Sequence, residues 1–131
     1  GTVRGNIGRS PTNRKKMALV EDERGKHAVT HYKTLEIFDG ASLVECRLET
    51  GRTHQVRVHL AASGHALLGD PVYGRTHQRH HALLTQLHFN RQALHAAVLG
   101  FIHPITGAAV RFESTLPADM AGLLVELGNK S

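Results

Sequence analysis

The sequence predicts an α+β domain, with a mixed, mainly antiparallel sheet and flanking helices, from three observations. Val, Thr, Tyr, Ile and Phe are concentrated between residues 28 and 38, a composition typical of a strand. Apolar and polar residues then alternate from Val44 to Glu49, which is the period of a half-buried strand. Apolar residues recur at helical spacing in later segments. Hairpin-paired strands with helices laid against one face define the α+β class.

Turn and capping residues place the first elements. The first twenty residues are expected to form an irregular basic arm, because Gly, Ser, Pro and Asn interrupt the Arg and Lys residues. Asp39-Gly40 is a hairpin signal, so the two strands on either side should pair antiparallel. A helix is predicted between Thr53, whose hydroxyl can cap it, and Gly64, a common C-terminal stop.

Residue spacing and turn residues also predict the elements of the second part of the chain. A less regular helix is predicted over residues 78–87, then a strand over residues 91–102. The turn sequence at 104–107 leads into a returning strand over residues 109–115. A final helix begins near Pro117 and stops at Gly128. No repeat or linker interrupts the chain, so residues 1–131 are expected to form one unit.

Length, charge and cysteine content narrow the class of protein. A chain of 131 residues is long enough for a substantial core. The chain has 16 Lys and Arg residues against 11 Asp and Glu residues, a net charge of +5 that favours a polyanionic partner such as RNA or DNA. A soluble protein that is merely basic is equally compatible with that charge. The single cysteine, Cys46, fits a reducing, cytoplasmic location. No apolar stretch approaches the roughly 20 residues of a membrane span.

The densest polar cluster is the segment GRTHQVRVH at residues 51–59, where a strand gives way to a helix. It holds five hydrogen-bond donors or cations: Arg52, His54, Gln55, Arg57 and His59. A helix N-terminus favours an anion such as phosphate or carboxylate. Solvated helix residues of basic character are the alternative. Arg57 shares a face with apolar residues and should point inward, where it requires a charged partner. The acidic residues occupy turns and outer strand faces, so the partner is expected to lie outside the chain.

Several motifs together resemble those of the RluA/RluD family of RNA pseudouridine synthases, most closely its D-like members. They occur in the family's order and cover nearly the whole chain: SPTNRKKMA (Ser10 to Ala18), HAVTHY (His27 to Tyr32), GRTHQVRVHLAASGHALLGDPVYG (ending at Gly74), RQALHA (Arg91 to Ala96) and HPITG (His103 to Gly107). The resemblance assigns the chain to the C-terminal part of the catalytic domain.

The resemblance implies isomerisation of uridine to pseudouridine in RNA, with large-subunit ribosomal RNA as the expected substrate and neither metal nor cofactor. It implies that Arg57 pairs with a nucleophilic aspartate of an upstream HRLD-type motif, and that Leu94 lines the pocket for the base. Arg52, His54 and Gln55 are the further candidates for substrate binding. The 131 residues contain no HRLD-type motif, so the chain is expected to be inactive alone.

Other residues receive structural or supporting roles. Asp70 is expected to form hydrogen bonds within its loop, and Tyr73 to be a packing anchor. The basic arm is expected to grip RNA phosphates through four side chains, although these could also be merely solubilising: Arg9, Arg14, Lys15 and Lys16.

Two alternative functions remain on the sequence. One is a non-catalytic RNA-binding module of the same fold. A histidine-rich metal-binding protein is the weaker one, because no Cys or well-placed carboxylate joins His77, His80 and His81. Half of a sheet would also expose an unpaired edge, which predicts self-association or association with the missing N-terminal half.

Overall fold

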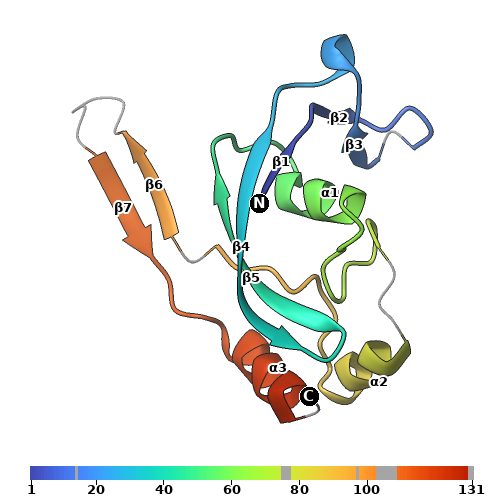
Figure 1. Cartoon of the computed structure of the whole chain (residues 1–131), viewed down its shortest axis with the longest axis vertical. Coiled ribbons are helices and arrows are strands. Elements are labelled where there is room, and N and C mark those ends of the chain that lie inside the picture. The colour runs from blue at the N-terminus through green and yellow to red at the C-terminus, as the bar shows by residue number, and fades with distance from the viewer. Residues whose placement is uncertain (14, 75–77, 97, 103–108, 130–131) are drawn as a thin grey trace.

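The computed structural model describes residues 1–13, 15–74, 78–96, 98–102 and 109–129. A long, curved hairpin runs through the middle of the molecule (Figure 1). One helix lies beside the end of this hairpin near the N-terminus, and two helices lie near its turn. No helix in the described ranges is long and apolar enough to span a membrane.

The central hairpin consists of β4 (Val29–Phe38) and β5 (Ala41–Leu48), and β1 (Thr2–Arg4) pairs with the start of β4. All these pairings are antiparallel. Phe38 pairs with Ala41, so Asp39 and Gly40 form a two-residue turn, and Gly40 adopts a φ of 74° there. The predicted hairpin is therefore confirmed. In the described residues the sheets contain antiparallel pairs alone, whereas the sequence had suggested a mixed sheet.

The described residues of the arm, 1–13 and 15–20, contain three short strands, which corrects the prediction of an irregular arm. β2 (Ile7–Arg9) and β3 (Met17–Leu19) pair antiparallel, with Ile7 opposite Leu19. Polar side chains hold the turn between them: the Ser10 hydroxyl accepts the backbone N–H of Asn13 at 3.2 Å. The short residues that argued against regular structure thus build a turn. A single 3₁₀ turn, η1 (Asp22–Arg24), follows.

Helix α1 (Gln55–Ala62) carries most of the polar cluster. The predicted cap at Thr53 is wrong, since the helix is preceded by His54, which has a φ of 56° and forms no side-chain cap. The Gln55 side chain instead accepts the backbone N–H of Arg52 at 3.0 Å. The predicted stop is confirmed, because Gly64 has a φ of 86° just after the helix, a conformation that glycine adopts without strain.

The second half of the chain differs from the prediction mainly in strand length. It contains α2 (Gln78–Gln86), a hairpin of β6 (Val98–Ile102) with β7 (Ala109–Glu113), and α3 (Ala118–Asn129). Residues 91–96 lie outside any strand, because their polar groups bond elsewhere. The Ala93 N–H, for example, donates to the Leu68 carbonyl at 2.8 Å. The expected turn at 104–107 lies outside the described residues.

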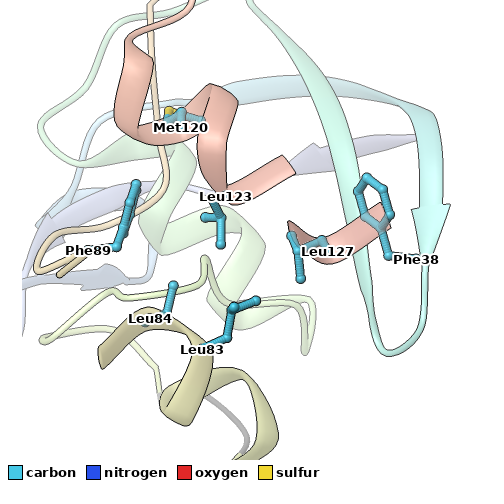
Figure 2. Packing of buried hydrophobic residues seen from close by; sticks show 7 residues of the cluster. All are labelled: Phe38, Leu83, Leu84, Phe89, Met120, Leu123 and Leu127. Atoms are coloured by element: carbon cyan, nitrogen blue, oxygen red, sulfur yellow. The ribbon is translucent and has the colours of Figure 1, made fainter. Parts of the chain in front are cut away.

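Two hydrophobic clusters stabilise the two ends of the hairpin. The larger joins the hairpin turn, α2 and α3 through seven buried side chains (Figure 2): Phe38, Leu83, Leu84, Phe89, Met120, Leu123 and Leu127. The smaller consists of Ile7, Ala28 and Val58, with Met17 and Tyr73 packed against it. Burying each large side chain stabilises the fold by about 1.5–3 kcal/mol. The smaller cluster fixes α1 against the N-terminal strands, and it thereby positions the polar segment.

Candidate functional site

Arg57 and Asp70 form a buried ion pair at the centre of the site. The Arg57 Nε and Nη2 atoms donate to the two carboxylate oxygens of Asp70, each at 2.9 Å. The Arg57 side chain is 10% exposed and the Asp70 side chain is 0% exposed. Arg57 does point inward, as predicted, and Asp70 is a partner within the chain that the sequence had not indicated. The pairing of Arg57 with an aspartate outside the chain stays a prediction. The loop after α1 brings Asp70 back beneath the helix, a long-range effect that spacing alone does not reveal.

Asp70 also organises its own loop, which confirms its predicted role. Its Oδ1 atom accepts the backbone N–H groups of Val72 at 2.9 Å and Tyr73 at 3.1 Å. Burial raises the pKa of the Asp70 carboxyl, but the hydrogen bond from Arg57 and the two backbone N–H groups together lower it below its ordinary value. Asp70 is therefore a charged anchor that holds both Arg57 and the loop in one arrangement.

Tyr73 brings together three residues that the sequence had nominated separately. The Arg57 guanidinium carbon lies 4.9 Å from the centre of the Tyr73 ring, and Lys16 Nζ lies 5.8 Å from it. His54 meets the ring edge-on, with 5.5 Å between the two centroids. The Tyr73 hydroxyl lies 2.7 Å from His54 Nδ1. We call Lys16, His54, Arg57 and Tyr73 the Tyr73 cluster.

Sequence reasoning missed this central place of Tyr73. Its packing role is confirmed, since it lies against the Ile7, Ala28 and Val58 cluster. The sequence did hold one indication of it: Tyr73 lies three residues after Asp70, and an Asp side chain can accept a backbone N–H a few residues further along the chain.

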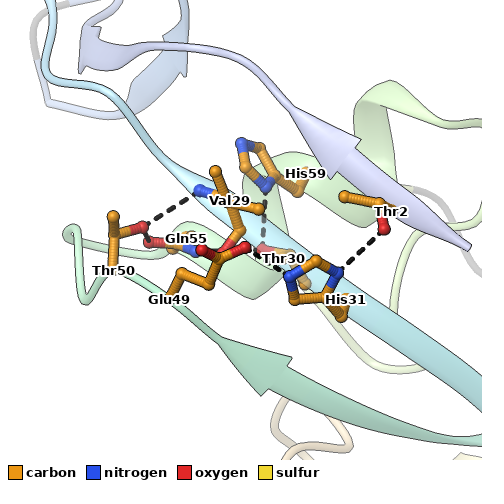
Figure 3. A network of polar contacts seen from close by, with 8 residues as sticks. All are labelled: Thr2, Val29, Thr30, His31, Glu49, Thr50, Gln55 and His59. Carbon is orange, nitrogen blue, oxygen red and sulfur yellow. Dashed lines mark hydrogen bonds and ion pairs between the residues drawn. The ribbon is translucent and has the colours of Figure 1, made fainter.

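Gln55 has a structural role in the fold, and its predicted role in substrate binding stays a prediction. It is 2% exposed, and both ends of its amide are fully engaged (Figure 3). Its Nε2 donates to the Val29 carbonyl at 2.9 Å and to Thr30 Oγ1 at 3.0 Å. Its Oε1 accepts the Thr50 hydroxyl at 2.7 Å and the Arg52 N–H at 3.0 Å. These four bonds use the bonding capacity of the amide, so a substrate could bind it only by breaking them.

His59 extends the same network and is also structural. It is 0% exposed, with Nε2 at 3.0 Å from the Gly5 carbonyl and Nδ1 at 2.8 Å from Thr30 Oγ1. A carbonyl only accepts, so Nε2 carries the proton and Nδ1 accepts from Thr30. The network therefore ties α1 to β4 and to the N-terminal strands. Figure 3 also shows a separate, exposed set of polar contacts, in which His31 contacts Thr2 and Glu49.

Two other candidates for substrate binding, Arg52 and Leu94, are at least partly exposed. Arg52 is half-buried and donates through Nε to the His27 carbonyl at 2.8 Å. Leu94 is 38% exposed and lies in the irregular segment, rather than in the strand that was predicted for it. Arg91 stabilises that segment: its Nη1 donates to the Leu94 carbonyl at 3.1 Å, while Nε and Nη2 bind Asp119 at 3.0 Å each. Within the described ranges, no hydrogen bond or ring contact joins Leu94 to the Tyr73 cluster.

The basic residues of the arm separate into two groups. Lys16 belongs to the Tyr73 cluster. Arg9 and Lys15 are exposed on the β2–β3 hairpin, and Arg14 lies outside the described residues. Strand β3 packs against α1, so the β2–β3 hairpin lies beside that helix.

The part of the chain that the structure describes contains no group of three or more side chains able to hold a metal ion. His80 is buried, and its Nε2 donates to the Asp39 carbonyl at 3.1 Å. It therefore stabilises the hairpin turn. His81 is exposed on α2, and His77 lies outside the described residues.

Replacement of Asp70 by Asn should lower the free energy of unfolding by about 3 kcal/mol at pH 7, because a nearly buried arginine loses its counter-charge. Since the pKa of Asp70 is depressed in the folded state, its contribution is complete above the ordinary value of 3.8 and disappears as the pH falls through the folded value. The difference between wild type and variant should therefore shrink below about pH 4. Urea unfolding at several pH values measures this. The exposed Glu45→Gln change is the control, and an equal difference at all pH values would contradict the account.

Comparison with known proteins identifies the fold. Residues 1–62 match the family model described as RNA pseudouridylate synthase. A ribosomal large subunit pseudouridine synthase D from Zymomonas mobilis is 62% identical over 120 residues, which cover 92% of this chain and 38% of that protein. An uncharacterised RNA pseudouridine synthase, YlyB, from Bacillus subtilis is 50% identical over 127 residues, which cover 97% of this chain and 39% of that protein.

Solved structures agree with these matches. The structure of human RNA pseudouridylate synthase domain containing 1 superposes with a TM-score of 0.67 at 30% identity, over 89% of this chain and 48% of that one. The chain thus spans about two fifths of the length of the curated relatives it matches. The sequence identity, the fold and the order of the motifs agree, and this chain belongs to the RluA/RluD family of RNA pseudouridine synthases.

Proposed function

We propose that the whole protein containing this chain isomerises uridine to pseudouridine in RNA, with large-subunit ribosomal RNA as substrate. The observation that carries the proposal is the 62% identity with a ribosomal large subunit pseudouridine synthase D, which extends over 92% of the chain. The cationic Tyr73 cluster adds support, because an RNA-modifying site requires donors for phosphate and carboxylate groups.

Arg57 has the geometry to support a second carboxylate. Asp70 engages Nε and Nη2, and among the described residues no acceptor lies on Nη1. A guanidinium has five N–H donors, so three remain after the bidentate pair. Asp70 fixes the guanidinium plane, which leaves the remaining N–H groups pointing in a set direction. In the proposed enzyme these groups hold the nucleophilic aspartate that the family resemblance places in an HRLD-type motif.

The nucleophile itself lies outside these 131 residues in this account, since the sequence contains no HRLD-type motif. The isolated chain should therefore bind RNA without forming pseudouridine. The second candidate function is a non-catalytic RNA-binding module, which the exposed Arg9 and Lys15 would suit equally well. An HRLD-type motif in the longer protein would favour the enzyme, and its absence there would favour the module.

In the whole protein, Arg57→Lys should lower the rate of pseudouridine formation by about 10²–10³-fold, because an ammonium cannot hold two carboxylates in one plane. The assay is tritium release or mass spectrometry on ribosomal RNA lacking the modification. Arg47→Lys is the matched control, since the Arg47 side chain is 82% exposed. The proposed function would be contradicted if the whole wild-type protein formed no pseudouridine in any ribosomal RNA, or if the isolated chain formed it.

The basic residues of the N-terminal arm are expected to contribute to RNA binding. Changing Arg9, Arg14, Lys15 and Lys16 together to Ala should weaken RNA binding and make its salt dependence shallower, by roughly 0.7 units of slope for each lost phosphate contact to a single strand. A gel-shift series from low to moderate salt measures both effects. An unchanged slope would remove the arm from RNA binding.

The outer edge of β4 is proposed as an association surface. The N-terminal segment covers β4 as far as Tyr32, whose backbone is hydrogen-bonded to Gly1, and beyond it Leu35 is 53% exposed and Ile37 is 77% exposed. An unpaired edge with exposed apolar side chains favours pairing with another strand, either from a second copy or from the rest of the protein.

Sedimentation of the isolated chain should therefore reveal oligomers, and Ile37→Lys should shift them toward monomer. Val125→Lys is the control, because Val125 is 61% exposed on α3 and not on β4. A monomeric isolated chain with one cooperative unfolding transition would contradict the proposal. A cytoplasmic location is proposed from the single cysteine, and cell fractionation would test it.

A further inference from the structure

We propose that Tyr73 is a positioning residue of this site: its hydroxyl orients His54 and its ring holds Lys16 beside Arg57, so that the His54 and Lys16 side chains face one phosphodiester of bound RNA. The inference rests on the proposed function for the identity of the ligand. It adds a residue that lies between the arm and α1, and it explains how groups far apart in the sequence form one binding surface.

The Tyr73 hydroxyl is placed to donate a hydrogen bond to His54. The Met17 backbone N–H donates to the Tyr73 oxygen at 2.9 Å, so that oxygen is already an acceptor. The hydroxyl proton is then free to point at His54 Nδ1, 2.7 Å away. A neutral imidazole that accepts at Nδ1 carries its proton on Nε2. His54 is exposed, so this Nε2–H is a donor available to a ligand.

The backbone of His54 supports the same conclusion. Its φ of 56° is a left-handed conformation that side-chain-bearing residues rarely adopt. This conformation costs free energy and persists only where surrounding contacts hold it. The contacts of the His54 side chain in the described structure are with Tyr73. Tyr73 therefore holds His54 in the place from which its ring faces outward.

The Tyr73 ring contacts two cations, Arg57 and Lys16. Arg57 lies 4.9 Å and Lys16 lies 5.8 Å from the ring centre, both within the range of attraction between a cation and an aromatic ring. Arg57 is fixed by Asp70, whereas Lys16 carries a flexible side chain that the ring can restrain. The ring thus keeps one arm cation beside the buried pair, although Lys16 and Arg57 are 41 positions apart in the sequence.

The loop that carries Tyr73 is held tightly enough to act as a support. Asp70 Oδ1 accepts the Tyr73 N–H at 3.1 Å, so the residue that holds Arg57 also holds Tyr73. At the next position, a Cβ on Gly74 would lie 2.1 Å from the Ala66 Cβ, so the loop packs closely against the segment after α1. Tyr73 therefore couples the buried pair, the arm and His54 through one rigid loop.

A phosphodiester fits this arrangement better than a base does. His54 offers an imidazole N–H and Lys16 offers an ammonium, and both groups are donors. Phosphate oxygens only accept, and charge-assisted bonds to them are strong. Such a contact would place the RNA backbone next to Arg57 without reading its sequence.

The test uses Tyr73→Phe in the longest natural protein that contains these residues. The substitution keeps the packed ring and its cation contacts but removes the hydroxyl. The chain has two tyrosines, and Tyr32→Phe is the matched control because Tyr32 is 38% exposed and outside the cluster. Nitrogen-15 NMR of the His54 side chain should reveal a single Nε2–H tautomer in wild type and in Tyr32→Phe, and a mixture of tautomers in Tyr73→Phe.

Binding to a labelled ribosomal RNA stem-loop, measured by fluorescence anisotropy, should weaken about fivefold in Tyr73→Phe, as expected for loss of one hydrogen bond. Because Tyr73 acts through His54, the double variant Tyr73→Phe/His54→Ala should bind no more weakly than His54→Ala. Additive losses, or an unchanged tautomer in Tyr73→Phe, would overturn the proposal, as would wild-type protein that binds no RNA. Wild-type protein that shows this binding pattern but forms no pseudouridine would overturn the proposed function and leave the role of Tyr73 intact.

Discussion

The buried pair of Arg57 and Asp70 is the interaction on which the rest of the site depends. A charge that leaves water must be paired and hydrogen-bonded, and here both carboxylate oxygens and two guanidinium nitrogens satisfy one another. Asp70 uses its remaining capacity to hold the backbone of the Tyr73 loop. The direction of Arg57, the course of the loop and the place of Tyr73 are therefore consequences of one ion pair.

The polar segment at residues 51–59 divides into supporting and outward-facing residues. Gln55 and His59 are buried and join α1 to β4 through Thr30. Arg52 and His54 lie at the start of the segment, where they remain accessible to a ligand. A dense run of donors thus performs two tasks: the inner residues fix the helix, and the outer ones meet solvent. Residue type alone does not distinguish them, because both groups consist of long polar side chains.

The distribution of the core explains how a part of a longer protein can hold this arrangement. The cluster around Ile7, Ala28 and Val58 supports the polar site directly, whereas the larger cluster fixes α2 and α3 against the hairpin turn. The edge of β4 beyond Tyr32 lacks a strand partner among the described residues. Helix α1 is joined to Thr30 near the start of β4, and the open edge is the later part of the same strand, so a segment that pairs along β4 would extend the sheet against which α1 lies.

Local patterns in the sequence determined the central hairpin, the positions of α1, α2 and α3, and the inward direction of Arg57. These features depend on alternation, helical spacing and turn residues that act over a few positions. Only the tertiary structure decided that Asp70 is the partner of Arg57, that Gln55 is buried, that the arm is a hairpin and that Leu94 lies outside a strand. Each of these depends on which distant groups satisfy a donor or a charge, and that choice is made when the chain folds back on itself rather than by neighbouring residues.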